Sequence, residues 1–123
     1  MDQLLKTTDL PFTTLKFYKK YVVSVVNEGE VLSKHQLQEL INICDRCYKD
    51  EGYVYISERI HIYNVDPTIY LNLYNVKNLK GIAIASSHIT ALNMANFEKN
   101  FSSVPFEVFT DFKDASAWAL KLV

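Results

Sequence analysis

The stretch from residue 57 to residue 68 carries the side chains best suited to bind a ligand or a partner. It brings together a guanidinium, an imidazole, an amide and several hydroxyls, on Ser57, Arg59, His61, Tyr63, Asn64 and Thr68. An arginine can hold a carboxylate or phosphate with two parallel hydrogen bonds, whereas a lysine offers only a point charge. We therefore expect these six residues to form a binding site, with Arg59 as its main group.

A structural role is the alternative for the same stretch. Arg59 could pair with Glu58 or Asp66. Asp66 followed by Pro67 is also typical of a helix start, where the Asp side chain caps the first turn. If a helix begins there, the free N–H groups of Thr68 and Ile69 could assist in holding an anion.

Two cysteines form a C-x-x-C motif at Cys44 and Cys47. A redox pair needs the N-terminus of a helix, where the thiol pKa is lowered, and a zinc site needs two more ligands. These cysteines instead lie in the third turn of a predicted helix, on its apolar face, and the chain has 2 Cys in total. We expect them to pack in the core, with no metal and no cofactor.

A serine hydrolase triad can be drawn from Ser57 or Ser86, His61 or His88, and Asp66. The sequence has no G-x-S-x-G elbow and no glycine-rich oxyanion loop, so we expect no enzyme. Ser87 is expected to cap a helix instead. A set of tyrosines could line an apolar pocket with polar tips, although core packing is their ordinary role: Tyr53, Tyr55, Tyr63, Tyr70 and Tyr74.

The elements that must position these groups follow from hydrophobic periodicity and turn residues. Five strands are predicted, at 12–18, 21–27, 53–57, 81–86 and 105–110. Four helices are predicted, beginning at Ser33, at Pro67, at Thr90 and after Asp111. The first has a capping box of Ser33 and Gln36 and ends before Gly52. In the last, Trp118 shares an apolar stripe with the sheet-facing residues, so we expect it to be buried.

The resulting order is β-β-α-β-α-β-α-β-α. Right-handed crossovers then predict an α/β fold whose sheet is mostly parallel, with one antiparallel strand. The chain of 123 residues suits a single domain, which we place at 12–123 after an N-terminal extension at 1–11.

Composition narrows the partners. The net charge is −1 and the lysines are scattered, which is unlike a nucleic-acid binder. No stretch approaches a membrane span, and no secretory signal opens the chain, so a cytoplasmic protein without integral membrane association is expected.

The element order and the closing stretch resemble the STAS superfamily, and more narrowly the small SpoIIAA-like (STAS/SEC14-type) proteins. The closing stretch runs from Phe106 through Asp111 to Trp118: a strand ending in Phe, an acidic turn, then Ala and Trp in the last helix. The segment 55–70 also resembles that of short members of this group. The resemblance implies a SpoIIAA-like fold and a non-catalytic binding or regulatory role.

One position departs from the pattern. Anti-sigma factor antagonists carry a phosphorylated Ser after an Asp where the third strand leads into the second helix. Here that Asp is Asp66 and the next residue is Pro67, with Thr68 as the nearby hydroxyl, so a phosphorylation switch at this position is not expected. The function predicted is a protein-binding or regulatory module. A small carrier of an apolar or anionic ligand is the alternative, and a hydrolase is the least favoured.

Overall fold

A computed structural model describes residues 2–123 and contains two β-sheets, three α-helices and two short 3₁₀ turns. The strands are β1 (Lys6–Asp9), β2 (Thr13–Phe17), β3 (Tyr21–Val26), β4 (Val31–Leu32), β5 (Tyr53–Glu58), β6 (Asn64–Val65), β7 (Leu79–Ala85) and β8 (Phe106–Phe109). The helices are α1 (Lys34–Tyr48), α2 (Ile89–Lys99) and α3 (Phe112–Leu122), and the 3₁₀ turns are η1 (Pro67–Tyr70) and η2 (Leu73–Asn75).

The main sheet has the order β1-β2-β3-β5-β7-β8, and β4 pairs with β6 in a separate parallel ribbon. Strand β2 runs antiparallel to both of its neighbours, and the pairs from β3 to β8 are parallel. The predicted fold class, a mostly parallel α/β sheet with one antiparallel strand, is therefore confirmed. Strand β1, which pairs with β2 along the sheet edge, falls within the segment described from sequence as an N-terminal extension.

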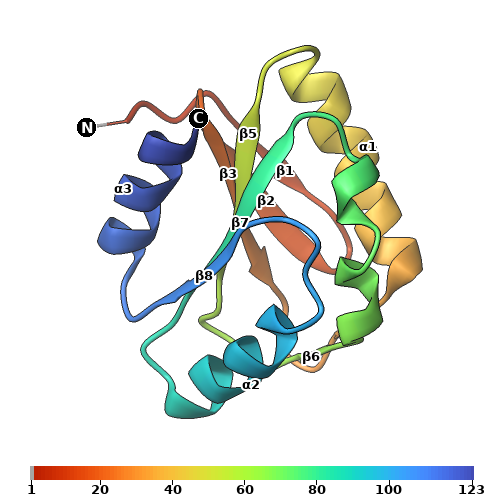
Figure 1. Ribbon diagram of the computed structural model, residues 1–123, viewed down its shortest axis with the longest axis vertical. Helices are drawn as coiled ribbons and strands as arrows, with labels where there is room; N and C mark the ends of the chain where they lie inside the picture. Colours follow the sequence, from red (N-terminus) through yellow and green to blue (C-terminus); the bar gives the residue numbers. More distant parts are fainter. Residues whose placement is uncertain (1) are drawn as a thin grey trace.

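Helices cover both faces of this sheet. In Figure 1, α3 lies on one side of the sheet, α1 and the 3₁₀ turns lie on the other, and α2 lies at one end of the molecule. Strand alternation explains the division, because successive side chains point to opposite faces. On β7, Ile82 and Ile84 belong to the larger core under α1, while Ala83 and Ala85 meet α3.

Local sequence signals account for most helix ends. The capping box of Ser33 and Gln36 is present, and the Asp111 side chain accepts a hydrogen bond from the Asp114 N–H (2.9 Å). Helix α1 ends at Tyr48, before the expected Gly52, because Lys49 adopts a positive φ of 55° and its N–H bonds back to the Asp45 carbonyl.

Three expectations need correction. The helix predicted from Pro67 is two separate 3₁₀ turns. The first residue of α2 follows His88, so Ser87 does not cap it. Trp118 is half-buried instead of buried, packing on Phe109 with 5.8 Å between ring centroids.

Candidate functional site

The C-terminal end of β5 leads into the stretch that sequence analysis singled out. The backbone there stays attached to the sheet, because the Arg59 N–H donates to the Ala85 carbonyl (2.8 Å). The Arg59 carbonyl in turn accepts a hydrogen bond from the Ser86 hydroxyl (2.8 Å). These bonds hold the start of the 59–63 loop against β7 and fix where each of its side chains points.

The side chain of Arg59 turns inward and forms a buried ion pair with Glu98 of α2. Its two terminal nitrogens donate to the two carboxylate oxygens at 2.8 and 2.5 Å, and the two side chains are only 3% and 4% exposed. The Tyr70 hydroxyl donates to the same carboxylate (2.7 Å), and the Tyr63 ring lies 5.2 Å from the guanidinium. Burial alone would lower the pKa of Arg59, but the hydrogen bonds and the charge of Glu98 raise it, so the pair stays ionised.

This geometry corrects the sequence hypothesis for Arg59. The guanidinium is not exposed at the strand end to hold an external anion, because both terminal nitrogens are already used. The structural alternative named the wrong partners, since neither Glu58 nor Asp66 pairs with it. Glu98 was missed, although a signal existed: it lies seven residues after Ala91 and three after Ala95, on the buried side of α2.

The other five predicted residues are divided between the interior and the surface. Ser57 and Tyr63 are buried and share a hydrogen bond of 2.8 Å between their hydroxyls. His61 and Asn64 are exposed. Thr68 is also exposed, and both its N–H (3.0 Å) and its hydroxyl (2.7 Å) donate to Asp66, which caps η1 as expected. The six residues therefore do not form one continuous binding site.

The groups proposed for a catalytic triad have structural partners instead. The Ser86 hydroxyl donates to the Arg59 carbonyl and accepts a hydrogen bond from the His88 N–H (3.1 Å). Ser57 is bonded to Tyr63. Both serines thus fix the loop and the start of α2.

The cysteine motif lies on α1 as expected. Cys44 is 1% exposed in the larger core, where burial raises the pKa of its thiol to about 12. Cys47 is partly exposed, and burial raises its pKa as well. Within residues 2–123, no three side chains of the His, Cys, Asp or Glu type come together as a metal site.

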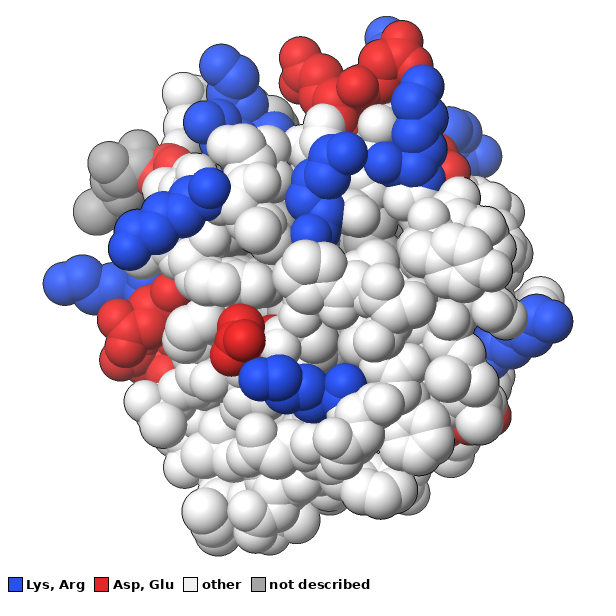
Figure 2. All heavy atoms as spheres, viewed as in Figure 1, with Lys and Arg blue, Asp and Glu red and all other residues white. Residues whose placement is uncertain are grey.

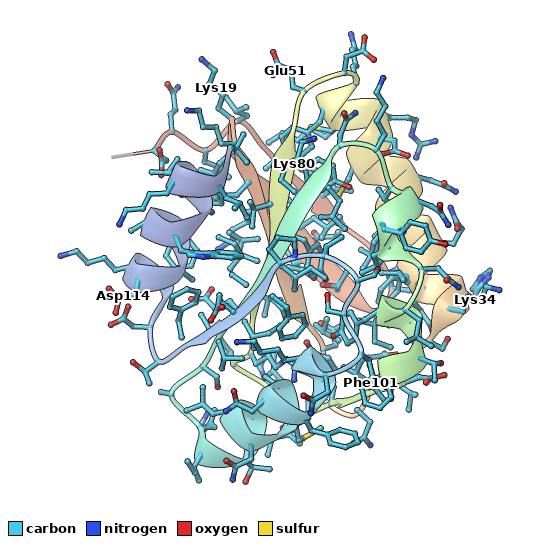
Figure 3. The ribbon with its side chains drawn as sticks, in the orientation of Figure 1. Lys19, Lys34, Glu51, Lys80, Phe101 and Asp114 are labelled. Atoms are coloured by element: carbon cyan, nitrogen blue, oxygen red, sulfur yellow. The ribbon has the colours of Figure 1, made fainter. Side chains whose placement is uncertain are left out.

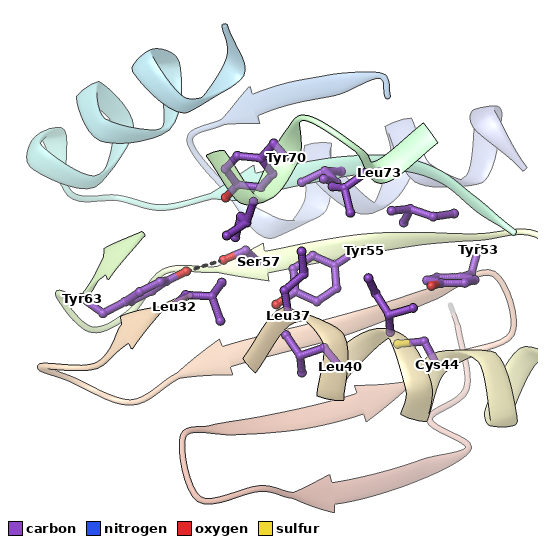
Figure 4. A pocket seen from close by; sticks show the side chains of 14 residues that line it. Leu32, Leu37, Leu40, Cys44, Tyr53, Tyr55, Ser57, Tyr63, Tyr70 and Leu73 are labelled. Carbon is purple, nitrogen blue, oxygen red and sulfur yellow. Dashed lines mark hydrogen bonds between the residues drawn. The ribbon is translucent and has the colours of Figure 1, made fainter. Parts of the chain in front are cut away.

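Four of the five predicted pocket tyrosines line a real cavity. Tyr53, Tyr55, Tyr63 and Tyr70 surround a hollow between the sheet, α1 and the 3₁₀ turns, while Tyr74 is 65% exposed outside it. Figure 4 shows Tyr55 between Leu37 and Leu40 of α1 and the Tyr70 and Leu73 side chains opposite.

The fold and these sites define a SpoIIAA-like α/β domain, and comparison with solved structures confirms that fold. The chain is similar to an uncharacterised protein of the DUF3478 family with a SpoIIAA-like fold from Shewanella loihica PV-4. The TM-score is 0.52 and the identity is 16%, over 97% of this chain and 95% of that one. At this identity the likeness concerns the fold alone. No family model matches the chain, and no curated protein matches it in sequence.

A membrane-spanning helix was also sought among residues 2–123. None of the helices there is long and apolar enough to cross a bilayer.

Proposed function

We propose that this domain is a non-catalytic binding or regulatory module, and that a protein partner docks at the end of the molecule formed by the 59–67 segment and α2. The observation that carries this proposal is an inverted loop. Arg59 and Tyr63 are 3% and 4% exposed, whereas Ile60 and Ile62 between them are 53% and 56% exposed. The polar side chain is inside and the apolar ones are outside, held there by the Arg59–Glu98 ion pair.

Neighbouring side chains extend this apolar surface. Met94 of α2 lines one shallow hollow with Ile62 and another with Val65 and Phe97, and Phe97 is 59% exposed. We call the set of Ile60, Ile62, Val65, Met94 and Phe97 the carboxyl-end surface. Large exposed apolar side chains gathered in one place are typical of interaction sites.

The same end of the molecule is poor in charge. Helix α2 carries no Lys, Arg, Asp or Glu from Ile89 to Phe97. In Figure 2 charged side chains gather on the upper part of the molecule, and the part around α2 is almost free of them. Figure 3 places Lys19, Glu51 and Lys80 at the end opposite α2.

This chemistry selects the kind of partner. Depletion of charge together with enrichment of Met, aromatic and aliphatic side chains is characteristic of the centre of protein interfaces. Nucleic acids and anionic membranes are held mainly by Lys and Arg, which the surface lacks. The partner surface should therefore be an apolar, uncharged face of another protein.

Regulation by phosphate at the position used in anti-sigma factor antagonists is not part of this proposal. Pro67 occupies that position, and the hydroxyl of Thr68 is engaged with Asp66. Mass spectrometry that finds stoichiometric phosphate on Thr68 in cells would contradict this view.

Site-specific photo-crosslinking in the native host tests the docking surface. A benzophenone amino acid replaces Phe97 in one variant and Asn42, an exposed residue of α1, in the control. We expect one defined protein to crosslink at position 97 and not at position 42. The purified partner should then bind I62D at least about tenfold more weakly than wild type, as is common for residues at an interface centre. Equal crosslinking at both positions, or unchanged binding by I62D, would refute the proposal. Crosslinking to a second copy of this chain would identify the partner as the protein itself.

The alternative function, a small carrier, retains support only for apolar ligands. An anionic ligand has lost its expected main contact, because Arg59 is bonded to Glu98. Native mass spectrometry of the purified protein separates the two functions, since a co-purifying small molecule favours the carrier. The hydrolase remains the least favoured, because Ser57 and Ser86 both have internal partners.

A further inference from the structure

The cavity beneath α1 has a size and a position that core packing does not explain. It lies over β5, the third of the four parallel strands counted from the β8 edge, and it separates α1 from the 3₁₀ turns. The hollow measures about 480 Å³ with its open mouth, of which about 30 Å³ is reached by the centre of a water molecule. Ligand pockets are typically about 300–1,000 Å³, so the hollow with its mouth falls within that range.

The cavity continues outward into a larger groove between α1 and the 3₁₀ turns, about 950 Å³ in volume. Four apolar side chains line both spaces and separate them: Leu37, Ile41, Ile69 and Leu73. Rotamer changes of such side chains occur on the nanosecond timescale when they are near the surface. A small molecule in the groove therefore has a short path to the cavity.

The gap exists because of local structure in the 66–78 segment. A continuous helix there would lay an unbroken apolar stripe against α1. The two 3₁₀ turns instead place Tyr74 outward, at 65% exposure, and only Ile69, Tyr70 and Leu73 cover the sheet.

One polar group in the cavity lacks a partner. The hydroxyl of Tyr55 is buried and makes no hydrogen bond. Ser24 lies near enough to influence the Tyr55 pKa, but its own hydroxyl is bonded to Thr13 (2.8 Å). A buried polar group without a partner costs about 1–3 kcal/mol, so an oxygen that accepts from this hydroxyl would recover a stabilising interaction.

The remaining polar groups indicate the charge of the occupant. Ser57 is bonded to Tyr63, and Tyr70 is bonded to Glu98. The residues that line the cavity include no Lys, Arg or His. A buried anion would have no cation to balance it there, which disfavours an ionised ligand.

From these features we infer that the cavity binds a small neutral molecule with an apolar body and one oxygen that accepts a hydrogen bond from Tyr55. This inference deepens the alternative carrier function and does not depend on protein docking at the carboxyl-end surface. It assigns Tyr55 as the specificity-determining residue and the groove between α1 and the 3₁₀ turns as the entrance.

Three probes of similar size test the chemistry. Acetophenone has a ring and a carbonyl acceptor, ethylbenzene lacks the acceptor, and benzoate carries a negative charge. Each is titrated into ¹⁵N-labelled protein while amide chemical shifts are recorded. We expect acetophenone to shift the amides of Leu37, Tyr55 and Leu73 and to bind more tightly than ethylbenzene or benzoate. No shift of these amides, or tighter binding of benzoate, would overturn the inference.

A matched pair of variants tests the assigned residue. Y55F removes the hydroxyl without its partner, and Y74F removes an exposed hydroxyl from the same side of the molecule. Y55F should weaken acetophenone binding about 3- to 10-fold, the effect of one neutral hydrogen bond, and leave ethylbenzene unchanged. Y74F should change neither.

Thermal unfolding of the ligand-free variants supplies a second readout. If the Tyr55 hydroxyl is unsatisfied, Y55F should unfold at the same temperature as wild type or higher. A clear drop in Tm would mean that the hydroxyl has an internal partner such as Ser24, and the inference would fail even if acetophenone binds.

Discussion

The pairing of Arg59 with Glu98 decides what the end of β5 can do chemically. A guanidinium that donates two hydrogen bonds to a buried carboxylate has no free pair of donors for an external anion. The residue whose type is most suited to recognition is therefore a structural residue. Its effect on the surface is indirect, because it anchors the loop from which Ile60 and Ile62 project.

Removing one member of this pair should be costly. R59A leaves the Glu98 carboxylate buried with only the Tyr70 hydroxyl as a partner, so the free energy of unfolding should fall by about 3–5 kcal/mol. Urea denaturation monitored by circular dichroism measures this. The control is K99A, which breaks the half-exposed Lys99–Glu107 pair and should cost less than about 1 kcal/mol. A loss below about 1 kcal/mol for R59A would mean that the ion pair contributes little to stability.

The two thiols should differ in reactivity for a related reason. Only a thiolate attacks a disulfide reagent, and burial raises the pKa of Cys44 to about 12. At about pH 8, roughly one Cys44 thiol in 10,000 is ionised. We expect dithionitrobenzoate to modify Cys47 slowly and to modify Cys44 only after unfolding in urea, as measured by absorbance and peptide mass spectrometry. Rapid modification of two thiols in the folded protein would show that Cys44 is accessible.

At the scale of elements, sequence patterns predicted those parts of the fold that local chemistry determines. The capping box of Ser33 and Gln36 marks the start of α1, and Asp111 marks the start of α3. The alternation of isoleucine and alanine in β7 identified its two faces. These signals lie within a few residues of the element that they specify, so they can be read without knowledge of the tertiary structure.

The parts that were missed depend on distant residues. Strand β1 reads as a polar segment, Lys6–Asp9, because it lies at the sheet edge and is stabilised only by pairing with β2. The 67–75 segment has helical spacing of apolar residues, yet it forms 3₁₀ turns tied to Ser103. The partner of Arg59 is 39 residues away, on a helix whose relation to β5 only the fold determines.

The contact between β7 and α3 leads to a prediction about packing. A Cβ at Gly81 would lie 2.5 Å from the Leu122 side chain and 3.0 Å from the ring of Trp118. G81A should therefore push the end of α3 outward and lower the free energy of unfolding by about 1–3 kcal/mol. Urea denaturation gives the loss, and Trp118 fluorescence reports the movement of the helix.

The matched double variant G81A/L122A distinguishes steric overlap from other effects. Leu122 contributes the closest atom, so its truncation should relieve the clash, and the double variant should lose less stability than the sum of the two single variants. Additive losses would mean that α3 does not contact Gly81 as described.

For the whole molecule, the two ends of the sheet differ in character. Charged residues such as Lys19, Glu51 and Lys80 gather at the end opposite α2, and the carboxyl-end surface is apolar. Between these ends, the larger core contains an unusual number of tyrosines with buried rings, which must keep their hydroxyls neutral. The stability of the domain should therefore depend on pH in the alkaline range.

Burial raises the pKa values of one thiol and five tyrosines in or beside this core: Cys44, Tyr48, Tyr53, Tyr55, Tyr63 and Tyr70. In the unfolded chain these groups ionise from about pH 9 for the thiol and about pH 10 for the tyrosines, whereas the folded protein keeps their protons. The unfolded state is then favoured as the pH rises, so stability that is fully present at neutral pH falls above about pH 9. At about pH 10.5, each tyrosine that stays protonated should lower the free energy of unfolding by about 0.8 kcal/mol.

Urea unfolding at about pH 8, 9, 10 and 10.5 measures this dependence, and absorbance at 295 nm reports how many tyrosines ionise before unfolding. We expect the urea midpoint to fall steeply above about pH 9, with most tyrosinate absorbance appearing only in the unfolding transition. Y53F serves as the matched variant, because it removes one titrating hydroxyl and should make the decline shallower. A midpoint that stays constant up to about pH 10.5, or tyrosinate absorbance that appears fully in the folded protein, would show that these hydroxyls are open to solvent. That result would also count against a closed cavity around Tyr55.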